Sequence, residues 1–241
     1  ELEELAAGAS TAASLASAGE LRSAILSAVS HDLRTPIAAI KASVSSLLQQ
    51  DVSWTDEARR EFLDTIDEEV DRLNGLVGNL LDMSRLQAGA VEVRREPVGL
   101  DEVVPAALRS LGGTADGVDV DVPESLPRVL ADAGLLERAL ANIVGNAVRH
   151  SPEGRRVSLL AGRADGGVDI RVVDCGEGVA VARREEMFLP FQRLGDSGDD
   201  DGVGLGLAVA KGFVEAMGGD IEVEETPGGG LTMVVRLEAS G

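Results

Sequence analysis

Residues 133–150, AGLLERALANIVGNAVRH, predict a helix with two unlike faces. At roughly 100° per residue, one arc is apolar and the opposite arc is polar. The apolar arc, which predicts the core side, holds Leu136, Leu140, Ile143, Val144, Ala147 and Val148. The polar arc holds Asn142, Asn146, Arg149 and His150. It contains no Asp or Glu, which favours a binding function over the alternative of a solvated surface.

The chemistry of this polar arc suits a nucleotide. Amide oxygens of Asn142 and Asn146 can complete the octahedral shell of a Mg²⁺ that arrives with a triphosphate, without adding negative charge. Arg149 can meet a phosphate directly.

The sequence around this helix mixes strand and helix patterns. Strands are predicted at 91–94, 118–122, 157–160, 168–173, 221–223 and 231–237. Further helices are predicted at 101–111 and 205–217. This order predicts an α+β domain in which helices pack against one face of a mixed sheet.

A short loop follows the predicted strand 168–173, with the sequence Asp174-Cys-Gly-Glu-Gly178. A carboxylate at a strand end can accept a hydrogen bond from an adenine amino group, and glycines let the base approach the backbone. Guanine presents a carbonyl at that position and would be repelled. The alternative is an ordinary acidic turn.

Residues 202–207, GVGLGL, open the predicted helix 205–217. Closely spaced glycines at a helix start expose free amides, which form an anion site. The pattern is neither a dinucleotide fingerprint nor a P-loop, because no Lys-Ser/Thr pair follows. The preceding FLPFQR (188–193) and the polar, acidic stretch 195–201 predict a mobile lid over a nucleotide. A surface loop without a role is the alternative.

The first ninety residues show a helical pattern of apolar residues and no strand pattern. Apolar stripes at 21–48 and 62–86 predict a helical hairpin that is joined near 49–55 and stopped by Gly89. Two helices cannot bury both stripes alone. Self-association into a four-helix bundle would do so, which favours a homodimer.

The hexapeptide His31-Asp-Leu-Arg-Thr-Pro36 lies on the first of these helices. His31 is predicted to be exposed, opposite the apolar stripe, and Asp32 can hydrogen-bond one ring nitrogen and leave the other as a nucleophile. Pro36 predicts a bend just after the histidine. The alternative is that Thr35 caps a new helix that begins at Pro36.

Composition excludes several classes of function. Acidic residues outnumber basic ones 42 to 22, for a formal charge of −20, which argues against a nucleic-acid partner. The single cysteine excludes an intramolecular disulfide framework. No run of 18 apolar residues and no signal peptide is evident, so the segment is expected to be soluble or to be cut from a larger protein.

Taken together, these blocks resemble the H, N, G1, F and G2 boxes of sensor histidine kinases. In order they are HDLRTP, LANIVGNAVRHSP, DCGEG, FLPFQR and GVGLGLA, followed by TPGGGLTMVVRL. The resemblance implies a linker or the end of an upstream helix at 1–19. It implies a dimerisation and phosphoacceptor domain at 20–90 and a GHKL-type ATP-binding sandwich at 91–241.

The resemblance also implies roles for individual residues. His31 would attack the γ-phosphate of ATP, with Asp32 as base, and Thr35 would orient the water that dephosphorylates a response regulator. Asn146 would be the main Mg²⁺ ligand, with Asn142 in support. Arg149 and His150 would contact the phosphates and the ribose, Asp174 would recognise adenine, and Gly176 and Gly178 would form walls of the adenine pocket. Gly202, Gly204 and Gly206 would act as hinges of the lid. Phe188 and Phe191 would anchor the lid, and Arg193 would contact a phosphate.

A finer likeness is to the potassium-responsive KdpD subfamily. It rests on SAVSHDLRTPIAAIKASVSSL (27–47), the DVSW loop, LVGNLLDMSRLQAGA (76–90) and FQRLGD. It implies a cytoplasmic region of a membrane-anchored bacterial sensor, with a response regulator of the KdpE type as partner. Alternatives are a GHKL ATPase with another output, such as a serine kinase or chaperone-like clamp, a regulator phosphatase, and a non-catalytic dimeric scaffold.

Overall fold

The computed structural model describes residues 29–49, 51–192, 204–226 and 228–240. Contacts divide the chain into two compact units, Glu1–Gly78 and Asn79–Gly241, which are described separately. The division falls within one continuous helix, α2 (Asp56–Gln87).

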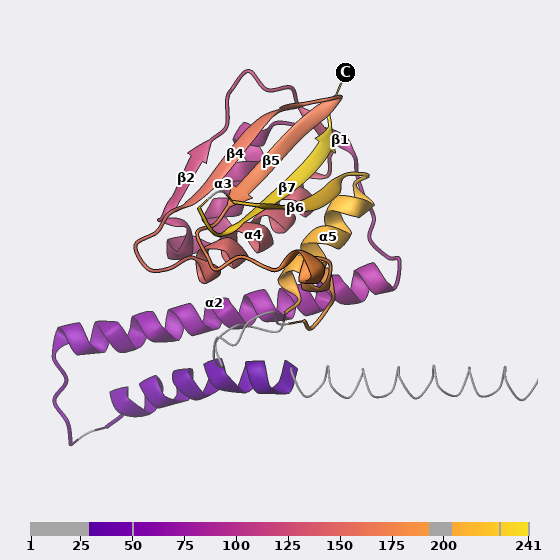
Figure 1. Cartoon of the computed structure of the whole chain (residues 1–241). Coiled ribbons are helices and arrows are strands. Elements are labelled where there is room, and N and C mark those ends of the chain that lie inside the picture. Colours follow the sequence, from indigo (N-terminus) through magenta and orange to yellow (C-terminus); the bar gives the residue numbers. More distant parts are fainter. Residues whose placement is uncertain (1–28, 50, 193–203, 227, 241) are drawn as a thin grey trace, which may run out of the picture. The chain divides into compact units, whose positions relative to one another are not determined.

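The first unit contains the described part of the predicted helical hairpin up to Gly78 (Figure 1), and residues 21–28 of the predicted first helix lie outside the described residues. Residues 29–47 are helical, and α2 follows a short connection. The helix continues through Thr35 and Pro36, so the alternative in which a new helix begins at Pro36 is wrong. In the connection, the indole of Trp54 donates a hydrogen bond to the carbonyl of Ser46 (2.8 Å) and meets the Phe62 ring edge-on.

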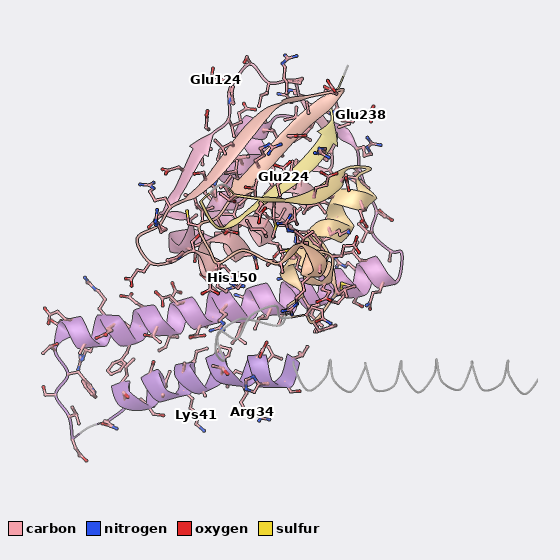
Figure 2. All side chains as sticks on the ribbon, in the orientation of Figure 1. Arg34, Lys41, Glu124, His150, Glu224 and Glu238 are labelled. Carbon is pink, nitrogen blue, oxygen red and sulfur yellow. The ribbon has the colours of Figure 1, made fainter. Side chains whose placement is uncertain are left out.

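Large apolar side chains remain exposed along this hairpin. They are Ile37, Val44 and Leu48 before the connection, and Leu63, Val70 and Val77 on α2. Arg34 and Lys41 extend from helix 29–47 on the side away from α2 (Figure 2). A single hairpin thus leaves unburied the apolar surface for which the sequence predicted a partner copy.

The second unit is built on a five-stranded mixed sheet (Figure 1). Its order is β2 (Val118–Asp121), β4 (Val157–Ala164), β5 (Gly167–Val173), β7 (Leu231–Glu238) and β6 (Asp220–Glu225). The β2 and β4 strands are parallel, and the other neighbours are antiparallel.

Three helices cover one face of this sheet, as predicted (Figure 1). They are α3 (Leu100–Ser110), α4 (Ala133–His150) and α5 (Gly206–Ala216). The core between the layers includes the apolar arc of α4 and alternate residues of β5, namely Val168, Ile170 and Val172. Short 3₁₀ turns lie at Gly112–Ala115, Val181–Arg183 and Glu186–Phe188.

The predicted strand at 91–94 is wrong, because those residues form no ladder. Val91 and Val93 instead pack, partly buried, against the core, which explains their alternation. The strand lies further along, as β1 (Glu96–Val98), paired antiparallel with β3 (Val129–Ala131), a strand that the sequence pattern did not predict.

Among the described residues, no helix is both long enough and apolar enough to cross a lipid bilayer.

Candidate functional site

His31 and Asp32 form a hydrogen-bonded pair in the first unit. Nδ1 of His31 lies 3.0 Å from Oδ1 of Asp32. The imidazole is 52% exposed, whereas the carboxylate is only 5% exposed. Because an ionised carboxylate can only accept, the pair favours the tautomer with the proton on Nδ1, which leaves Nε2 with a free lone pair. Thr35, one turn further on, is exposed.

The second group of site residues lies on α4 in the other unit. The carboxylate of Asp132 begins this helix by accepting hydrogen bonds from the amides of Gly134 and Leu135. Asn142 and Asn146 are partly buried and one turn apart, and Arg149 and His150 are exposed at the end of the helix. Figure 2 labels His150. The two faces predicted for this helix are therefore present.

The first residue of α5 faces this polar arc. A Cβ atom at Gly206 would lie 3.4 Å from Oδ1 of Asn142. The residue before it, Leu205, makes no side-chain capping bond to the helix, so the first amides of α5 keep their capacity to bind an anion. The structure thus brings an amide oxygen and a positive helix end together, as a metal-phosphate group requires.

These residues fit a magnesium ion that is carried by its nucleotide. Among the described residues, no group of three or more His, Cys, Asp or Glu side chains could hold a metal. Neutral oxygens from Asn142 and Asn146, together with phosphate oxygens and water, match the hard, oxygen-rich shell that Mg²⁺ prefers. These donors suit a Mg²⁺ site whose ligands come partly from the nucleotide, and not a site formed by protein side chains alone.

Asp174 is held at the end of β5 by three backbone hydrogen bonds. Its Oδ1 atom accepts from the amides of Gly176 and Leu231, each at 2.9 Å. Its own amide donates to the carbonyl of Leu231, also at 2.9 Å. The residue is buried.

The glycines of this loop allow close approaches. A Cβ atom at Gly176 would lie 2.7 Å from the carbonyl oxygen of His150, so this loop meets the end of α4. Gly178 has a φ of 74°, and its Cβ would lie 3.1 Å from the carbonyl oxygen of Gly230. The loop therefore lies between α4 and the β6–β7 connection, and a side chain at Gly176 would force the loop away from the end of α4.

The described ends of the predicted lid lie together. The amide of Phe191 donates to the carbonyl of Gly204 (2.9 Å), and Gly204 has a φ of 68°. The Phe188 ring lies beneath the ammonium group of Lys211 on α5, at 5.0 Å. Arg193, Gly202 and the acidic stretch at Asp199–Asp201 lie outside the described residues.

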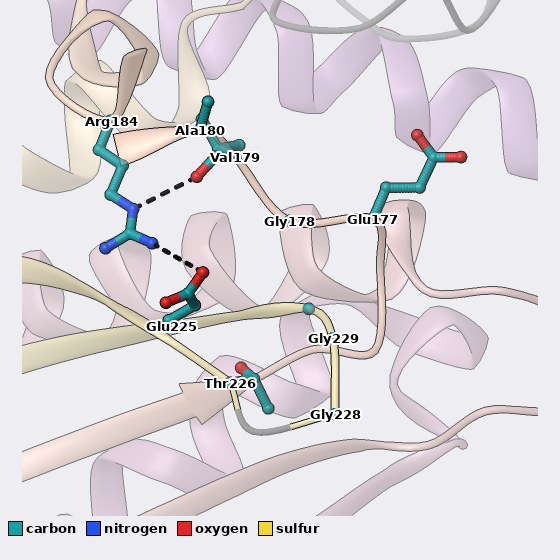
Figure 3. A pocket seen from close by; sticks show the side chains of 10 residues that line it. Glu177, Gly178, Val179, Ala180, Arg184, Glu225, Thr226, Gly228 and Gly229 are labelled. Atoms are coloured by element: carbon teal, nitrogen blue, oxygen red, sulfur yellow. Dashed lines mark hydrogen bonds and ion pairs between the residues drawn. The ribbon is translucent and has the colours of Figure 1, made fainter. Parts of the chain in front are cut away.

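A pocket of about 580 Å³ opens beside the Asp174–Gly178 loop (Figure 3). Gly178, Val179, Arg184 and Glu225 are among its lining residues, whereas Asp174, Asn142 and Asn146 are not. Of the predicted site residues that the structure describes, only Gly178 lines this cavity, which therefore adjoins the others. The Arg184 guanidinium that lines it already donates to the carbonyls of Val179 and Val223.

Two features near the site were not predicted from the sequence. One is the backbone of Leu231, which holds Asp174; the adjacent glycine run was the available signal. The other is an ion pair between Asp82 on α2 and Arg138, which lies one turn before Asn142 on α4. Burial raises the pKa of Asp82, and the positive charges of Arg138 and Arg85 oppose that rise.

Two family models match this chain. A family model described as the His Kinase A (phospho-acceptor) domain matches residues 21–89. A second, described as the Histidine kinase-, DNA gyrase B-, and HSP90-like ATPase, matches residues 131–241. The chain carries both domains in this order and belongs to the sensor histidine kinases.

Within that family, the chain is similar to the sensor protein KdpD. The protein of that name from Mycobacterium tuberculosis is 50% identical over 98% of this chain, and the one from Rathayibacter rathayi is 44% identical over the same share. The chain spans 28% of the length of each of these relatives.

Solved structures show the same fold. The histidine kinase AdeS of Acinetobacter baumannii has a TM-score of 0.61 and 21% identity, over 88% of this chain and 98% of that one. ShkA, solved at full length in complex with AMPPNP, has a TM-score of 0.60 and 31% identity, over 90% of this chain and 46% of that one.

Proposed function

We propose that this chain is the catalytic region of a sensor kinase, which phosphorylates His31 from Mg-ATP and passes the phosphoryl group to an aspartate of a response regulator. The observation that carries the proposal is the exposed His31 ring hydrogen-bonded to the buried Asp32, in a chain whose other unit has the ATPase fold. An exposed histidine without such a partner would have no fixed tautomer.

The hydrogen-bonded pair supports the following chemistry for transfer to His31. The Nε2 lone pair attacks the γ-phosphorus of ATP, and the bond from phosphorus to the β–γ bridging oxygen breaks, so that ADP leaves with that electron pair. Positive charge develops on the ring during attack. Asp32 stabilises this charge and can take the Nδ1 proton, since Oδ1 lies 3.0 Å from that nitrogen.

The nucleotide would bind to the second unit. Asp174 would accept a hydrogen bond from the adenine amino group, and the phosphates would meet Arg149, His150 and the start of α5. Mg²⁺, held by the amide oxygens of Asn146 and Asn142, would neutralise phosphate charge. Gly204 and Gly206 would act as lid hinges.

Partners and setting belong to the same proposal. The exposed apolar residues of the hairpin favour a homodimer through a four-helix bundle. Similarity to KdpD favours a receiver domain of the KdpE type as phosphoryl acceptor, potassium-responsive signalling, and a place on the cytoplasmic side of a longer, membrane-anchored sensor. Thr35, exposed beside His31, would orient the water that dephosphorylates the regulator.

Incubation with γ-labelled ATP tests the proposal directly. The chain should acquire label that is labile to acid and stable to alkali, as expected for a phosphorus–nitrogen bond. His31→Gln should abolish the label while the affinity for Mg-ATP stays within about twofold of the parent, because His31 lies in the other unit from the ATPase fold. Label retained by His31→Gln would refute the site.

A second step separates the alternatives. Adding a purified receiver domain of the KdpE type should move the label to an aspartate of that domain. ATP hydrolysis without protein label would instead indicate a clamp-type ATPase, and label stable to acid would indicate a serine kinase. A chain that binds no nucleotide would be a scaffold. Loss of phosphate from a pre-phosphorylated receiver, without labelling of His31, would indicate a phosphatase.

A further inference from the structure

Three successive glycines precede β7, and the third lies against Asp174. Gly228, Gly229 and Gly230 have φ values of 97°, 103° and 99°, so all three adopt backbone that L side chains rarely adopt. Their surroundings differ. A Cβ atom at Gly228 would meet nothing within 4 Å, whereas one at Gly230 would lie 2.2 Å from the Asp174 carbonyl oxygen and 3.0 Å from its Oδ1 atom.

The residue after this turn holds the carboxylate itself. Leu231 makes two hydrogen bonds with Asp174: its amide donates to Oδ1, and its carbonyl oxygen accepts from the Asp174 amide. The Gly176 amide donates to the same Oδ1 atom. Two donors on one oxygen oppose rotation of the carboxylate, so Oδ2 is the oxygen that remains to accept a hydrogen bond from a ligand.

The turn also packs against the rest of the loop. A Cβ atom at Gly178 would lie 3.1 Å from the carbonyl oxygen of Gly230. The hydroxyls of Thr226 and Thr232 lie 2.9 Å apart and close the base of the turn. Gly228 and Gly229 line the same pocket as Glu177 and Gly178 (Figure 3).

We propose that the Gly228–Gly230 turn is a specificity-determining element, in which Gly230 and the Leu231 amide orient Asp174 so that only an acceptor oxygen faces the base. This proposal rests on the proposed function, in which Asp174 recognises adenine. Gly230 and Leu231 are positioning residues, because they act through Asp174 and do not themselves touch the nucleotide.

The turn offers a matched pair of variants. Gly230→Ala and Gly228→Ala place the same side chain on nearly the same φ, so their backbone strain is alike, and only the first meets Asp174. Gly230→Ala should weaken Mg-ATP binding on the order of 10- to 100-fold, the loss expected for a hydrogen bond to a charged acceptor. It should leave Mg-GTP binding unchanged, so the ATP-to-GTP preference should fall.

Gly228→Ala should keep both dissociation constants within about threefold of the parent, because it adds no contact. At saturating ATP, Gly230→Ala should label His31 at a rate within a few-fold of the parent, because the reacting phosphates are bound elsewhere. A Gly230→Ala protein that keeps its ATP-to-GTP preference, or a Gly228→Ala protein that loses it equally, would overturn the proposal.

Asp174→Asn tests the orientation without disturbing the turn. If two amides hold the Oδ1 position, the introduced asparagine must place its oxygen there and direct its NH₂ group, a donor, to the base. The ATP-to-GTP preference should then invert, because guanine presents a carbonyl. If the side chain is free to flip, the introduced amide presents its oxygen to adenine and the preference survives, which would refute the proposal even if Gly230→Ala fails to fold.

The same titrations separate this inference from the proposed function. A parent chain that binds no Mg-ATP contradicts both. A parent chain that binds ATP and labels His31, but whose Gly230→Ala variant behaves like Gly228→Ala, contradicts only the role of the turn.

Discussion

The ion pair between Asp82 and Arg138 gives a quantitative prediction for the ATPase unit. The Asp82 side chain is 3% exposed and that of Arg138 is 42% exposed. The Arg138 guanidinium also lies 5.8 Å from the Phe213 ring centroid. Arg138→Met would leave a buried carboxylate without its partner. Removing one member of a buried pair costs about 3–5 kcal/mol, and the exposure of Arg138 favours the lower end.

We therefore expect Arg138→Met to lower the free energy of unfolding by about 3 kcal/mol at pH 8. For a chain of this size, that corresponds to a fall of about 6–12 °C in Tm. Arg95→Met is the matched control, because Arg95 is 40% exposed but its partner Glu238 is 60% exposed. An exposed pair contributes at most about 1 kcal/mol. Urea and thermal unfolding followed by circular dichroism measure both variants.

The pH dependence provides a second, independent check. Burial raises the pKa of Asp82 above its ordinary value of 3.8, against the opposing charges of Arg138 and Arg85. A raised pKa means that the folded state binds the proton more tightly than the unfolded state does. The stabilisation that protonation of Asp82 provides is therefore fully present below pH 3.8 and is lost as the pH rises through the folded-state pKa. Without Arg138 the pKa rises further.

The loss of unfolding free energy caused by Arg138→Met should therefore be smaller at pH 5 than at pH 8. Adding Asp82→Asn to the Arg138→Met protein should restore most of that lost stability. A deficit below about 0.5 kcal/mol at pH 8, equal to that of Arg95→Met, would show that Asp82 gains nothing from its partner. A deficit that does not change between the two pH values would contradict the assignment of the effect to a buried charge.

Other predictions concern the two sites. Asn146→Asp should reduce His31 labelling about tenfold or more at limiting Mg²⁺, because it adds negative charge beside the triphosphate; a titration of labelling rate against Mg²⁺ measures this. Trp54→Phe removes the hydrogen bond to the Ser46 carbonyl and should lower the stability of the hairpin by about 1 kcal/mol, measured by urea unfolding. Gly204→Ala should weaken ATP binding several-fold in equilibrium titration, because its Cβ would lie 2.6 Å from the Gln192 carbonyl oxygen on backbone with positive φ.

Features encoded by neighbouring residues were predictable from the sequence. The helix α4 begins and ends where its periodicity indicates, because Asp132 caps its start and its apolar arc is buried as one stripe. The same holds for the exposed His31 and its bond to Asp32, which are adjacent residues. The stop at Gly89, which has a φ of 62°, was likewise visible in the sequence.

Features that depend on distant residues were not predictable in this way. The strand β1 is three residues long and exists because β3 lies beside it, so the valine alternation at 91–94 was misleading. The burial of Asp82 depends on Arg138, and the orientation of Asp174 depends on an amide 57 positions later. Any residue except proline can supply a backbone amide donor, so the identity of Leu231 does not reveal that its amide binds Asp174. The neighbouring glycine run, which makes room for that contact, is visible in the sequence.

The helix α2 belongs to both units of the chain. His31 lies in one unit and the Asn142 and Asp174 residues lie in the other, and the boundary between the units falls between Gly78 and Asn79, inside α2. The last turns of α2 belong to the ATPase unit, because Leu86 packs against its core and Asp82 pairs with Arg138. Arg138 is one turn from Asn142 on the same helix face. The last turns of α2 are therefore joined, through this ion pair, to the helix that carries the magnesium ligands proposed here.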